Sequence, residues 1–487
     1  MKTYIKNLFL LPAVIAGLGL IPAGRVTAQT FTNLHSFTYY GSDGATPDAG
    51  LILSGNTLYG TTSGGGDWYG GTVFKINTDG TGLATLYSFT YGNDGGYPYA
   101  GLILSGNTLY GTTVEGGSSS KGTVFAVNTN GTGFTNLYSF TGGSDGALPY
   151  AGLILSSNTL YGTAFGGSSS GYGTVFAVNT NGTGFTNLHS FTALANYANS
   201  DGANPAAGLI LSNNTLYGTA VHGGSSGSGT AFKVNTDGTG FTNLHSFSFS
   251  DGANPHAGLI LSGTALYGTT YQGGSLGGGT VFKVNTDGTG FTNLHGFTAL
   301  SASSPYTNSD GANPESGLIL SGNTLYGSAN RGGSSGNGTV FAVNTDGTGF
   351  TNLHGFTATS GTLSTNSDGA NPLAGLILSG NTLYGTATAG GMYGTANFGG
   401  SSGNGTVFSL ALGSVSAPAP TLTIVPSGAN VILTWPTDAA GFTLQSATNL
   451  VSPAVWSNVS PGPIIVNGQY AVTNPASGTK KFYQLSQ

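Results

Sequence analysis

Four short apolar runs recur along this chain, separated by turns rich in Gly, Asn and Asp. In the first copy the runs are Leu51–Ser54, Thr57–Thr61, Thr72–Asn77 and Leu83–Phe89. Each run has the length of a strand, and no stretch shows the helical spacing of apolar residues. Gly-Asn joins the first two runs and Asp-Gly joins the last two, and both dipeptides favour tight hairpin turns. The pattern therefore predicts a unit of four antiparallel strands.

The same unit occurs seven times, at a period of roughly 50 to 60 residues. Its opening word, GLILS, begins at Gly50, Gly101, Gly152, Gly208, Gly258, Gly317 and Gly375. Consecutive apolar residues in each run suit a sheet that is buried on both faces, as in blades that pack on one another. Four strands at this period predict an all-β fold, a seven-bladed β-propeller over residues 29–412.

The phase of the repeat predicts how the propeller closes. An isolated fourth strand, Phe31–Phe37, precedes the first GLILS, and the seventh copy runs to Thr406–Leu410 without a fourth strand of its own. We expect Phe31–Phe37 to complete the seventh blade, because this pairing hides two open sheet edges.

The first 28 residues have the pattern of a signal peptide. Lys2 and Lys6 precede the apolar run Leu8–Leu20, and small residues end at Ala28, where we expect cleavage. A membrane anchor is the alternative, but the run is short and Pro12 interrupts it. We therefore expect a secreted protein, extracellular or at the cell surface, with no transmembrane segment in the mature chain.

Composition excludes several classes of protein. The chain has no Cys and only 5% charged residues, 16 acidic against 10 basic, so it lacks disulfides and any basic cluster for nucleic acid. Its 87 Gly residues suggest low-complexity disorder, but apolar residues recur at fixed places, which disordered chains lack. We expect the mature chain to be a monomer.

The wording of the repeat resembles a known family. GLILSGNTLYGTT at Gly50–Thr62 and GGTVFKINTDGTG at Gly70–Gly82, with their six echoes, are similar to the GloVer tandem repeats of exported bacterial choice-of-anchor proteins. The resemblance implies export and a propeller-like array, with no agreed catalytic activity. A kelch-like relationship is a weaker suggestion, since kelch repeats also run about 50 residues.

The wording changes after Leu412. Residues 413–420 contain Ala-Pro-Ala-Pro and are predicted to be a short stiff linker. Residues 421–487 alternate as strands do, and Trp435, Trp456, Tyr470 and Phe482 are candidates for a small core. We interpret this segment as a small β-sandwich of the fibronectin-III or immunoglobulin type.

Most polar residues that recur in every copy are better explained by the fold than by chemistry. A ring with a polar tip occupies one position of the fourth strand, and an Asp-Gly loop follows it. The ring residues are His35, Tyr87, Tyr138, His189, His245, His295 and His354; the acids are Asp43, Asp94, Asp145, Asp201, Asp251, Asp310 and Asp368. Exchange of His for Tyr disfavours a base or a metal ligand, and Asp before Gly favours a turn that binds its own loop over a cation site. In the NTDGTG turns a calcium loop is the alternative, but copies without an acid favour a hairpin turn. We expect no metal and no cofactor.

The copies differ mainly in two loops, which in a four-stranded propeller share one face. Variable aromatic and hydrogen-bonding side chains there are the candidate ligand-binding residues, and drift on exposed loops is the alternative. They are Asp48, Tyr99, Tyr150, His256 and Glu315 before GLILS, and Trp68, Glu115, Phe165, His222, Gln272 and Arg331 after TLYGT. Two longer linkers, Ala193–Asn199 and Leu300–Asn308, fall on the same face.

Three functions remain open. The sequence carries no HExxH, phosphate loop or cysteine site, so no catalytic residue is assigned and a non-enzymatic role is favoured. The leading hypothesis is a binding module for a carbohydrate or a cell-surface protein. The alternatives are an exported polysaccharide lyase or hydrolase, with Glu115, Glu315, His256 and Arg331 as first suspects, and a structural adhesion protein.

Overall fold

The computed structural model describes residues 30–38, 41–360, 365–388, 404–412, 422–427, 430–436, 443–448, 456–460, 462–466, 469–475 and 481–486. The predicted signal peptide and the linker at 413–420 lie outside these residues. All regular elements of the described part are strands, and no helix there is long and apolar enough to cross a membrane. Residues Gln29–Leu412 form one compact unit, and the strands after Gly413 belong to another.

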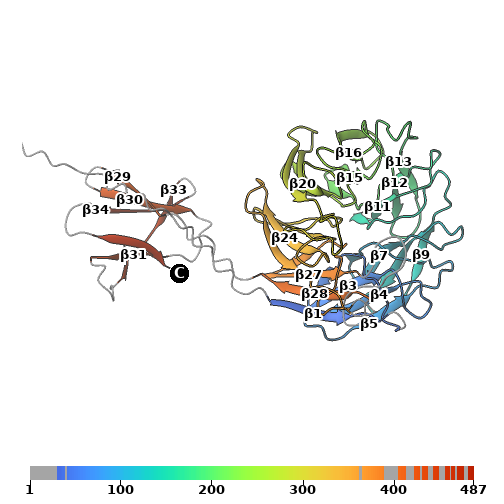
Figure 1. Cartoon of the computed structure of the whole chain (residues 1–487), viewed down its shortest axis with the longest axis horizontal. Helices are drawn as coiled ribbons and strands as arrows, with labels where there is room; N and C mark the ends of the chain where they lie inside the picture. Colours follow the sequence, from blue (N-terminus) through green and yellow to red (C-terminus); the bar gives the residue numbers. More distant parts are fainter. Residues whose placement is uncertain are drawn as a thin grey trace, which may run out of the picture. The chain divides into compact units, whose positions relative to one another are not determined.

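Seven four-stranded sheets, the blades, follow one another through the first unit (Figure 1). Blade 1 contains β2 (Ile52–Ser54), β3 (Thr57–Thr62), β4 (Thr72–Asn77) and β5 (Ala84–Ser88). Blade 2 contains β6 (Ile103–Ser105), β7 (Thr108–Thr113), β8 (Thr123–Asn128) and β9 (Thr135–Ser139). Blade 3 contains β10 (Ile154–Ser156), β11 (Thr159–Ala164), β12 (Thr174–Asn179) and β13 (Thr186–Ser190).

The next three blades repeat the same antiparallel order, in which each strand pairs with its neighbour in sequence. Blade 4 contains β14 (Ile210–Ser212), β15 (Thr215–Ala220), β16 (Thr230–Asn235) and β17 (Thr242–Ser246). Blade 5 contains β18 (Ile260–Ser262), β19 (Ala265–Thr270), β20 (Gly277–Asn285) and β21 (Thr292–Thr298). Blade 6 contains β22 (Ile319–Ser321), β23 (Thr324–Ala329), β24 (Thr339–Asn344) and β25 (Thr351–Gly355). The four predicted strands of the first copy are confirmed, and each predicted end lies within one residue of the end of β2, β3, β4 or β5.

The seventh blade combines the two ends of the unit, as predicted. It contains β26 (Ile377–Ser379), β27 (Thr382–Ala387), β28 (Thr406–Ala411) and β1 (Thr30–Ser36). The first strand of the described chain pairs antiparallel with β28, from Thr30 opposite Ala411 to Ser36 opposite Thr406, and the blue and orange strands lie side by side in Figure 1. This pairing gives the seventh blade its fourth strand.

Each blade packs on the next through one repeated contact between two buried phenylalanines. The Phe at the end of the fourth strand, or directly after it, lies edge-on to the Phe of the third strand in the next blade, with ring centroids 5.0–5.6 Å apart. Such edge-to-face pairs stabilise beyond the area that they bury. The last pair, Phe37 on Phe74, joins blade 7 to blade 1, so the set of blade contacts is complete around the ring.

The Gly of TLYGT makes room for this aromatic layer. A Cβ on Gly60 would lie 2.7 Å from the ring of Phe74 and from a methyl of Leu51, and the equivalent Gly of every blade meets the same ring at 2.6–2.7 Å. The following residue then ties the blades together, because its hydroxyl donates to a carbonyl of the next blade. Thr61 binds Ala100 O at 3.0 Å, and Thr386 binds Ala49 O at 3.0 Å across the closure.

The recurrent His or Tyr of the fourth strand and the recurrent Asp of the following loop bind each other in all seven blades. The ring tip donates to the carboxylate at 3.0–3.2 Å, as in His189 Nε2 to Asp201 Oδ2. Each carboxylate also accepts a backbone N–H from the residue after the buried Phe, at 2.7–3.3 Å. Six of the rings stack on a Phe of the next blade at 3.6–4.2 Å; Leu83 stands in that Phe position in blade 1. The structural interpretation of these residues is confirmed.

The pKa of Asp201 reflects this contact. Burial alone would raise it, but the hydrogen bonds from His189, Thr192 and the backbone outweigh burial and hold the pKa below its ordinary value. In the NTDGTG turns, Asp79 accepts from the backbone N–H of Thr81 at 2.9 Å and from its hydroxyl at 2.7 Å. Asn130 makes the same two bonds without a charge, so the hairpin-turn interpretation is confirmed.

The second unit contains two small sheets. One has the order β29 (Thr423–Ser427), β30 (Asn430–Pro436), β34 (Gln469–Pro475), β33 (Ile464–Val466), and the other has β32 (Ser457–Asn458), β31 (Thr443–Ala447), β35 (Phe482–Ser486). Leu433 and Trp435 of the first sheet share a buried cluster with Leu444 of the second. Phe482 was expected in this core, but it is 36% exposed and does not belong to the cluster.

We expect Phe37→Ala to lower the free energy of unfolding of the first unit by about 3–5 kcal/mol, the usual cost of truncating a buried Phe. Removal of Gln29–Phe37 should lower the melting temperature by many degrees, because β28 then loses its partner. Phe249→Ala, at a ring that is 60% exposed, is the matched control and should change stability little. Guanidinium and thermal denaturation measure both effects. An unchanged melt after the deletion would contradict closure through β1.

We expect His189→Tyr to be nearly neutral, because Tyr87 and Tyr138 already fill this position in other blades. His189→Phe keeps the stacked ring but removes the donor to Asp201, and should lower the free energy of unfolding by about 1–3 kcal/mol. Denaturation of the two variants in parallel makes the comparison. Equal losses would show that the polar tip contributes nothing.

Candidate functional site

The two variable loops lie on one face of the propeller, as expected. In six blades a residue of the loop after the second strand pairs through its backbone with an Ala or Gly of the loop that enters the blade. Examples are Gly96 with Glu115, Ala203 with His222 and Ala312 with Arg331. These bridges bring the two loops of each blade together, and the blades repeat the arrangement around the ring.

Five of the predicted residues surround the axis of the propeller at this face. Each stands two residues before the Gly that begins GLILS, and these seven glycines form a tight ring. A Cβ on each would lie 3.1–3.9 Å from the carbonyl oxygen of the Gly in the preceding blade, with Gly50 next to Gly375. We call the half-buried side chains Asp48, Tyr99, Tyr150, His256 and Glu315 the axial cluster.

Aromatic rings make up one side of the axial cluster. The rings of Tyr99 and Tyr150 are 5.6 Å apart and tilted by 46°. Phe165 meets Tyr150 edge-on at 5.4 Å, and Tyr271 meets His256 edge-on at 5.5 Å. Neighbouring blades therefore supply a nearly continuous run of half-buried rings from Tyr99 to Phe165.

Two carboxyl groups belong to the same cluster, and both have raised pKa values. Burial raises the pKa of Asp48 to about 6, against the opposing effect of hydrogen bonds from Ser63 and Thr388. Burial raises the pKa of Glu315 to about 7; Arg331 opposes this shift, and the charge of Asp48 adds to it. The Ser63 hydroxyl lies 2.5 Å from Asp48 Oδ2. These carboxyl groups interact with each other electrostatically although they come from blades 1 and 6.

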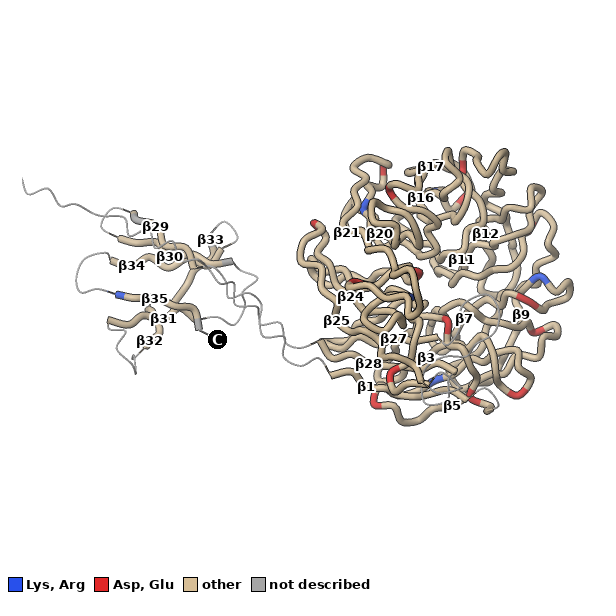
Figure 2. Tube along the Cα trace, viewed as in Figure 1, with Lys and Arg blue, Asp and Glu red and all other residues tan. Residues whose placement is uncertain are grey.

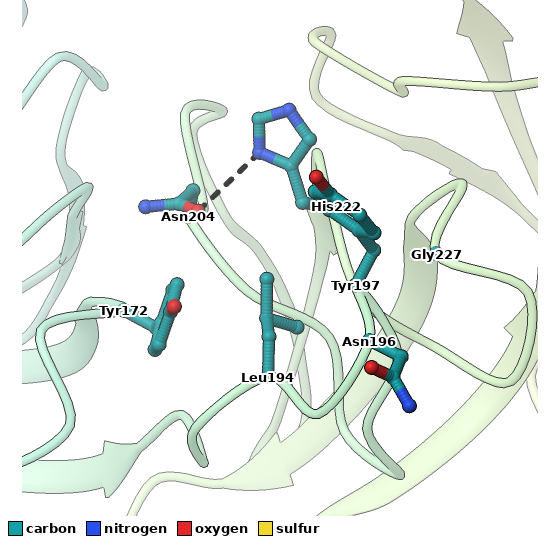
Figure 3. A pocket seen from close by; sticks show the side chains of 7 residues that line it. All are labelled: Tyr172, Leu194, Asn196, Tyr197, Asn204, His222 and Gly227. Carbon is teal, nitrogen blue, oxygen red and sulfur yellow. Dashed lines mark hydrogen bonds between the residues drawn. The ribbon is translucent and has the colours of Figure 1, made fainter.

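Both histidines of this face have pKa values below the ordinary one. Burial lowers the pKa of His256 to about 4, and the nearby His222 lowers it further. Local desolvation of the ring also lowers the pKa of His222, although the residue as a whole is exposed, and its Nδ1 lies 3.3 Å from Asn204 Oδ1. His222 borders a cavity between blades 3 and 4 (Figure 3).

The other predicted residues lie farther from the axis. Glu115, His222, Gln272 and Arg331 occupy one equivalent loop position and are exposed. Trp68 is 63% exposed, and the preceding backbone N–H, from Asp67, donates to Ser88 of the outermost strand β5. The loop that carries Trp68 is thus attached to the outermost strand of blade 1.

Sequence reasoning missed Tyr271 although the signal was present. Counted from TLYGT, Tyr271 and Phe165 stand at the same position of blades 5 and 3, together with Ser63 and Thr388. Burial and the charge of Glu315 raise the pKa of Tyr271, while Arg331 opposes the shift. Strict alignment of the copies on TLYGT would have placed this ring in the cluster.

Charged residues are sparse over the propeller, and acidic side chains outnumber basic ones (Figure 2). Among the residues that the structure describes, no group of three or more His, Asp or Glu side chains is arranged to hold a metal ion. The axial cluster supplies rings for stacking and carboxyl groups, Asp48 and Glu315, for hydrogen bonding and proton exchange.

The chain is similar to several solved structures at low sequence identity. An oligogalacturonate lyase in complex with manganese is 12% identical, covers 79% of this chain and 93% of its own, and has a TM-score of 0.48. The oligogalacturonate lyase of Vibrio parahaemolyticus is 11% identical, with 78% and 93% covered and a TM-score of 0.45. A chain of the nidogen/laminin complex is 16% identical, with 51% and 79% covered and a TM-score of 0.35.

No curated protein matches the sequence. One family does match, over residues 19–198 and 191–308, which together are more than half of the chain. These segments contain the repeat words of the first copies, in agreement with the resemblance carried by GLILS and TLYGT. The chain belongs to the Gloeobacter/Verrucomicrobia repeat family.

Proposed function

We propose that this chain is an exported, non-catalytic binding protein that recognises a carbohydrate through the axial cluster. The observation that carries the proposal is the run of half-buried rings, Tyr99, Tyr150 and Phe165, next to hydrogen-bonding groups at Asp48 and Glu315. Binding sites in proteins combine aromatic walls with a few placed polar groups in this way. Export is supported by the predicted signal peptide at residues 1–28.

Sugars suit this combination of groups. One face of a sugar ring is apolar and can stack on Tyr99 or Tyr150, while its hydroxyl groups both donate and accept hydrogen bonds. Asp48 and Glu315 accept such bonds when ionised, and each also donates one when protonated. Sparse charge argues against a partner that depends on many ion pairs, such as nucleic acid.

The scaffold supports recognition because it is rigid where the cluster is attached. Each of the five residues is followed within two positions by a Gly in the tight axial ring, which leaves its backbone little room to move. A binding group held by a rigid element loses little conformational entropy when the ligand arrives. Differences between blades then set the specificity without altering blade packing.

A glycan array probed with the exported chain, with and without calcium, tests the proposal. We expect selective binding of one carbohydrate class, and Tyr99→Ala with Tyr150→Ala to weaken it by about tenfold or more, because stacked rings are frequent hot spots. The melting temperature should hardly change, since both rings are half-exposed. Phe249→Ala, an exposed ring outside the cluster, is the control and should bind normally. If the chain binds no glycan both with calcium and without it, a structural role in adhesion is favoured.

A polysaccharide-acting enzyme is the second candidate, favoured by one observation. Asp48 and Glu315 have pKa values of about 6 and about 7, in the range where a carboxyl group can donate or accept a proton near neutral pH. Two carboxyl groups around a sugar are also the usual equipment of glycoside hydrolysis. Release of reducing ends from a bound glycan, lost in Glu315→Gln, would support this function over binding alone.

The raised pKa of Glu315 predicts how stability depends on pH. Its folded-state pKa lies above the ordinary value, so the neutral form stabilises the fold at low pH, and that contribution is lost as pH rises through about 7. We expect the melting temperature of Glu315→Gln to fall less than that of the parent chain between pH 5 and pH 8. Glu115→Gln, at an exposed carboxyl group, is the control. Parallel pH profiles of the parent and the Glu315 variant would contradict burial of this group.

A further inference from the structure

A separate cavity of about 480 Å³ lies beside the axial cluster, between blades 3 and 4 (Figure 3). This volume falls within the range in which proteins hold small organic ligands. Its lining comes from a blade 3 loop, from the long linker that joins the two blades, and from blade 4. The side chains are Tyr172, Leu194, Asn196, Tyr197, Asn204 and His222.

The long linker exists at few blade junctions and forms one wall of the cavity. Between the buried Phe and the recurrent Asp it runs from Phe191 to Asp201, whereas the next junction needs only Phe247 to Asp251. Asn199 holds the linker in place. Its amide donates to Thr192 O and Gly202 O at 2.9 and 2.7 Å, and its carbonyl oxygen accepts the N–H groups of Gly202 and Gly224, both at 2.9 Å.

The tip of the linker is a strained hairpin with an exposed aromatic ring. Ala195 and Ala198 exchange backbone hydrogen bonds of 2.8 and 3.1 Å around Asn196 and Tyr197, which have φ values of 51° and 68°. Gly or Asn normally fills such positions, and a Tyr there is strained. The ring of Tyr197 is nevertheless 83% exposed at the rim of the cavity. Residues with a strained backbone whose side chains are not buried in the core are often found at ligand sites.

The polar groups of the cavity have defined orientations. Asn204 donates its amide to Phe165 O at 2.9 Å, so its carbonyl oxygen faces His222 Nδ1 at 3.3 Å. His222 must therefore carry its hydrogen on Nδ1, which leaves Nε2 as an acceptor. Figure 3 shows the rings of Tyr172 and Tyr197 around the same space, and no charged side chain lines it. The cavity thus offers rings, one acceptor and amide groups to a neutral polar molecule.

We propose that this cavity binds one neutral sugar residue, stacked on Tyr197 and hydrogen-bonded to His222 and Asn196. This proposal rests on the proposed function, which supplies the class of polymer. It adds a second sugar subsite next to the axial cluster. The two are connected, because Phe165 contacts Tyr150 through its ring and Asn204 through its carbonyl oxygen. A glycan chain that enters the axial cluster would then place a further residue between blades 3 and 4.

Saturation-transfer NMR of the full chain with a panel of free neutral monosaccharides tests the cavity directly. We expect at least one sugar to bind, and Tyr197→Ala and His222→Ala each to weaken it about tenfold or more. Tyr306→Ala is the matched control, because Tyr306 is an exposed ring, 51% accessible, on the long linker between blades 5 and 6. Tyr99→Ala should leave this signal intact, which separates the cavity from the axial cluster.

A linker exchange provides the second variant. Replacing Thr192–Ser200 with Ser248-Phe249-Ser250, the short linker of the next junction, removes the cavity wall but keeps the blade ends that this fold already accepts. We expect the melt to be retained and the monosaccharide signal to disappear. A signal that survives the exchange and Tyr197→Ala, or a panel that shows no binding, would overturn the cavity proposal. If Tyr99→Ala abolishes binding on the glycan array while the cavity variants do not change the monosaccharide signal, the cavity proposal fails and the proposed function stands.

Discussion

The edge-on contact between two phenylalanines of consecutive blades is the interaction on which the rest of this fold depends. A four-stranded blade cannot bury its own third-strand ring, so the Phe that ends the previous blade covers it. Both rings are at most 1% exposed in every pair, and the Gly of TLYGT is required because a Cβ there would meet the ring. Repetition of one contact therefore implies a closed ring, in which the last contact must come from the other end of the chain. Phe37, directly after β1, supplies it, which explains why a lone fourth strand precedes the first complete repeat.

The recurrent His or Tyr and the recurrent Asp of each blade stabilise this closed ring. The ring and the Asp that meet in each blade connect the outer strand to the linker that leaves it, whatever the length of that linker. The pair was not visible in the sequence, because the spacing varies from His245 and Asp251 to His295 and Asp310. Sequence separation does not predict which residues are in contact where loops of different length have both ends fixed by the same contact. The sequence still indicated each partner separately, since exchange of His for Tyr requires a flat ring with a polar tip.

Prediction from the sequence was strongest where geometry follows from period alone. Strand positions, blade number and the shared face of two loops all derive from alternation, turn residues and repeat length, and they agree with the structure. The axial cluster was predicted as residues but not as an arrangement. Trp68 was grouped with Tyr99 because both are variable, yet a backbone bond from Asp67 to Ser88 attaches its loop to the outermost strand of blade 1. Tyr197 was overlooked because neither its positive φ nor the exposure of its ring can be recognised in the sequence.

The same reasoning explains why variation gathers on one face. The edge-on contacts between blades use phenylalanines that recur in all copies, and these lie in the strands or at their ends. A linker can therefore lengthen, as between Phe191 and Asp201, without loss of a blade contact, provided that its ends remain held. Asn199, Asn308 and Asn366 each close a long linker with the same hydrogen bonds to the following loop. Additions to this face thus cost little stability, and a rigid ring that accepts new loops at low cost is a scaffold on which binding surfaces can form.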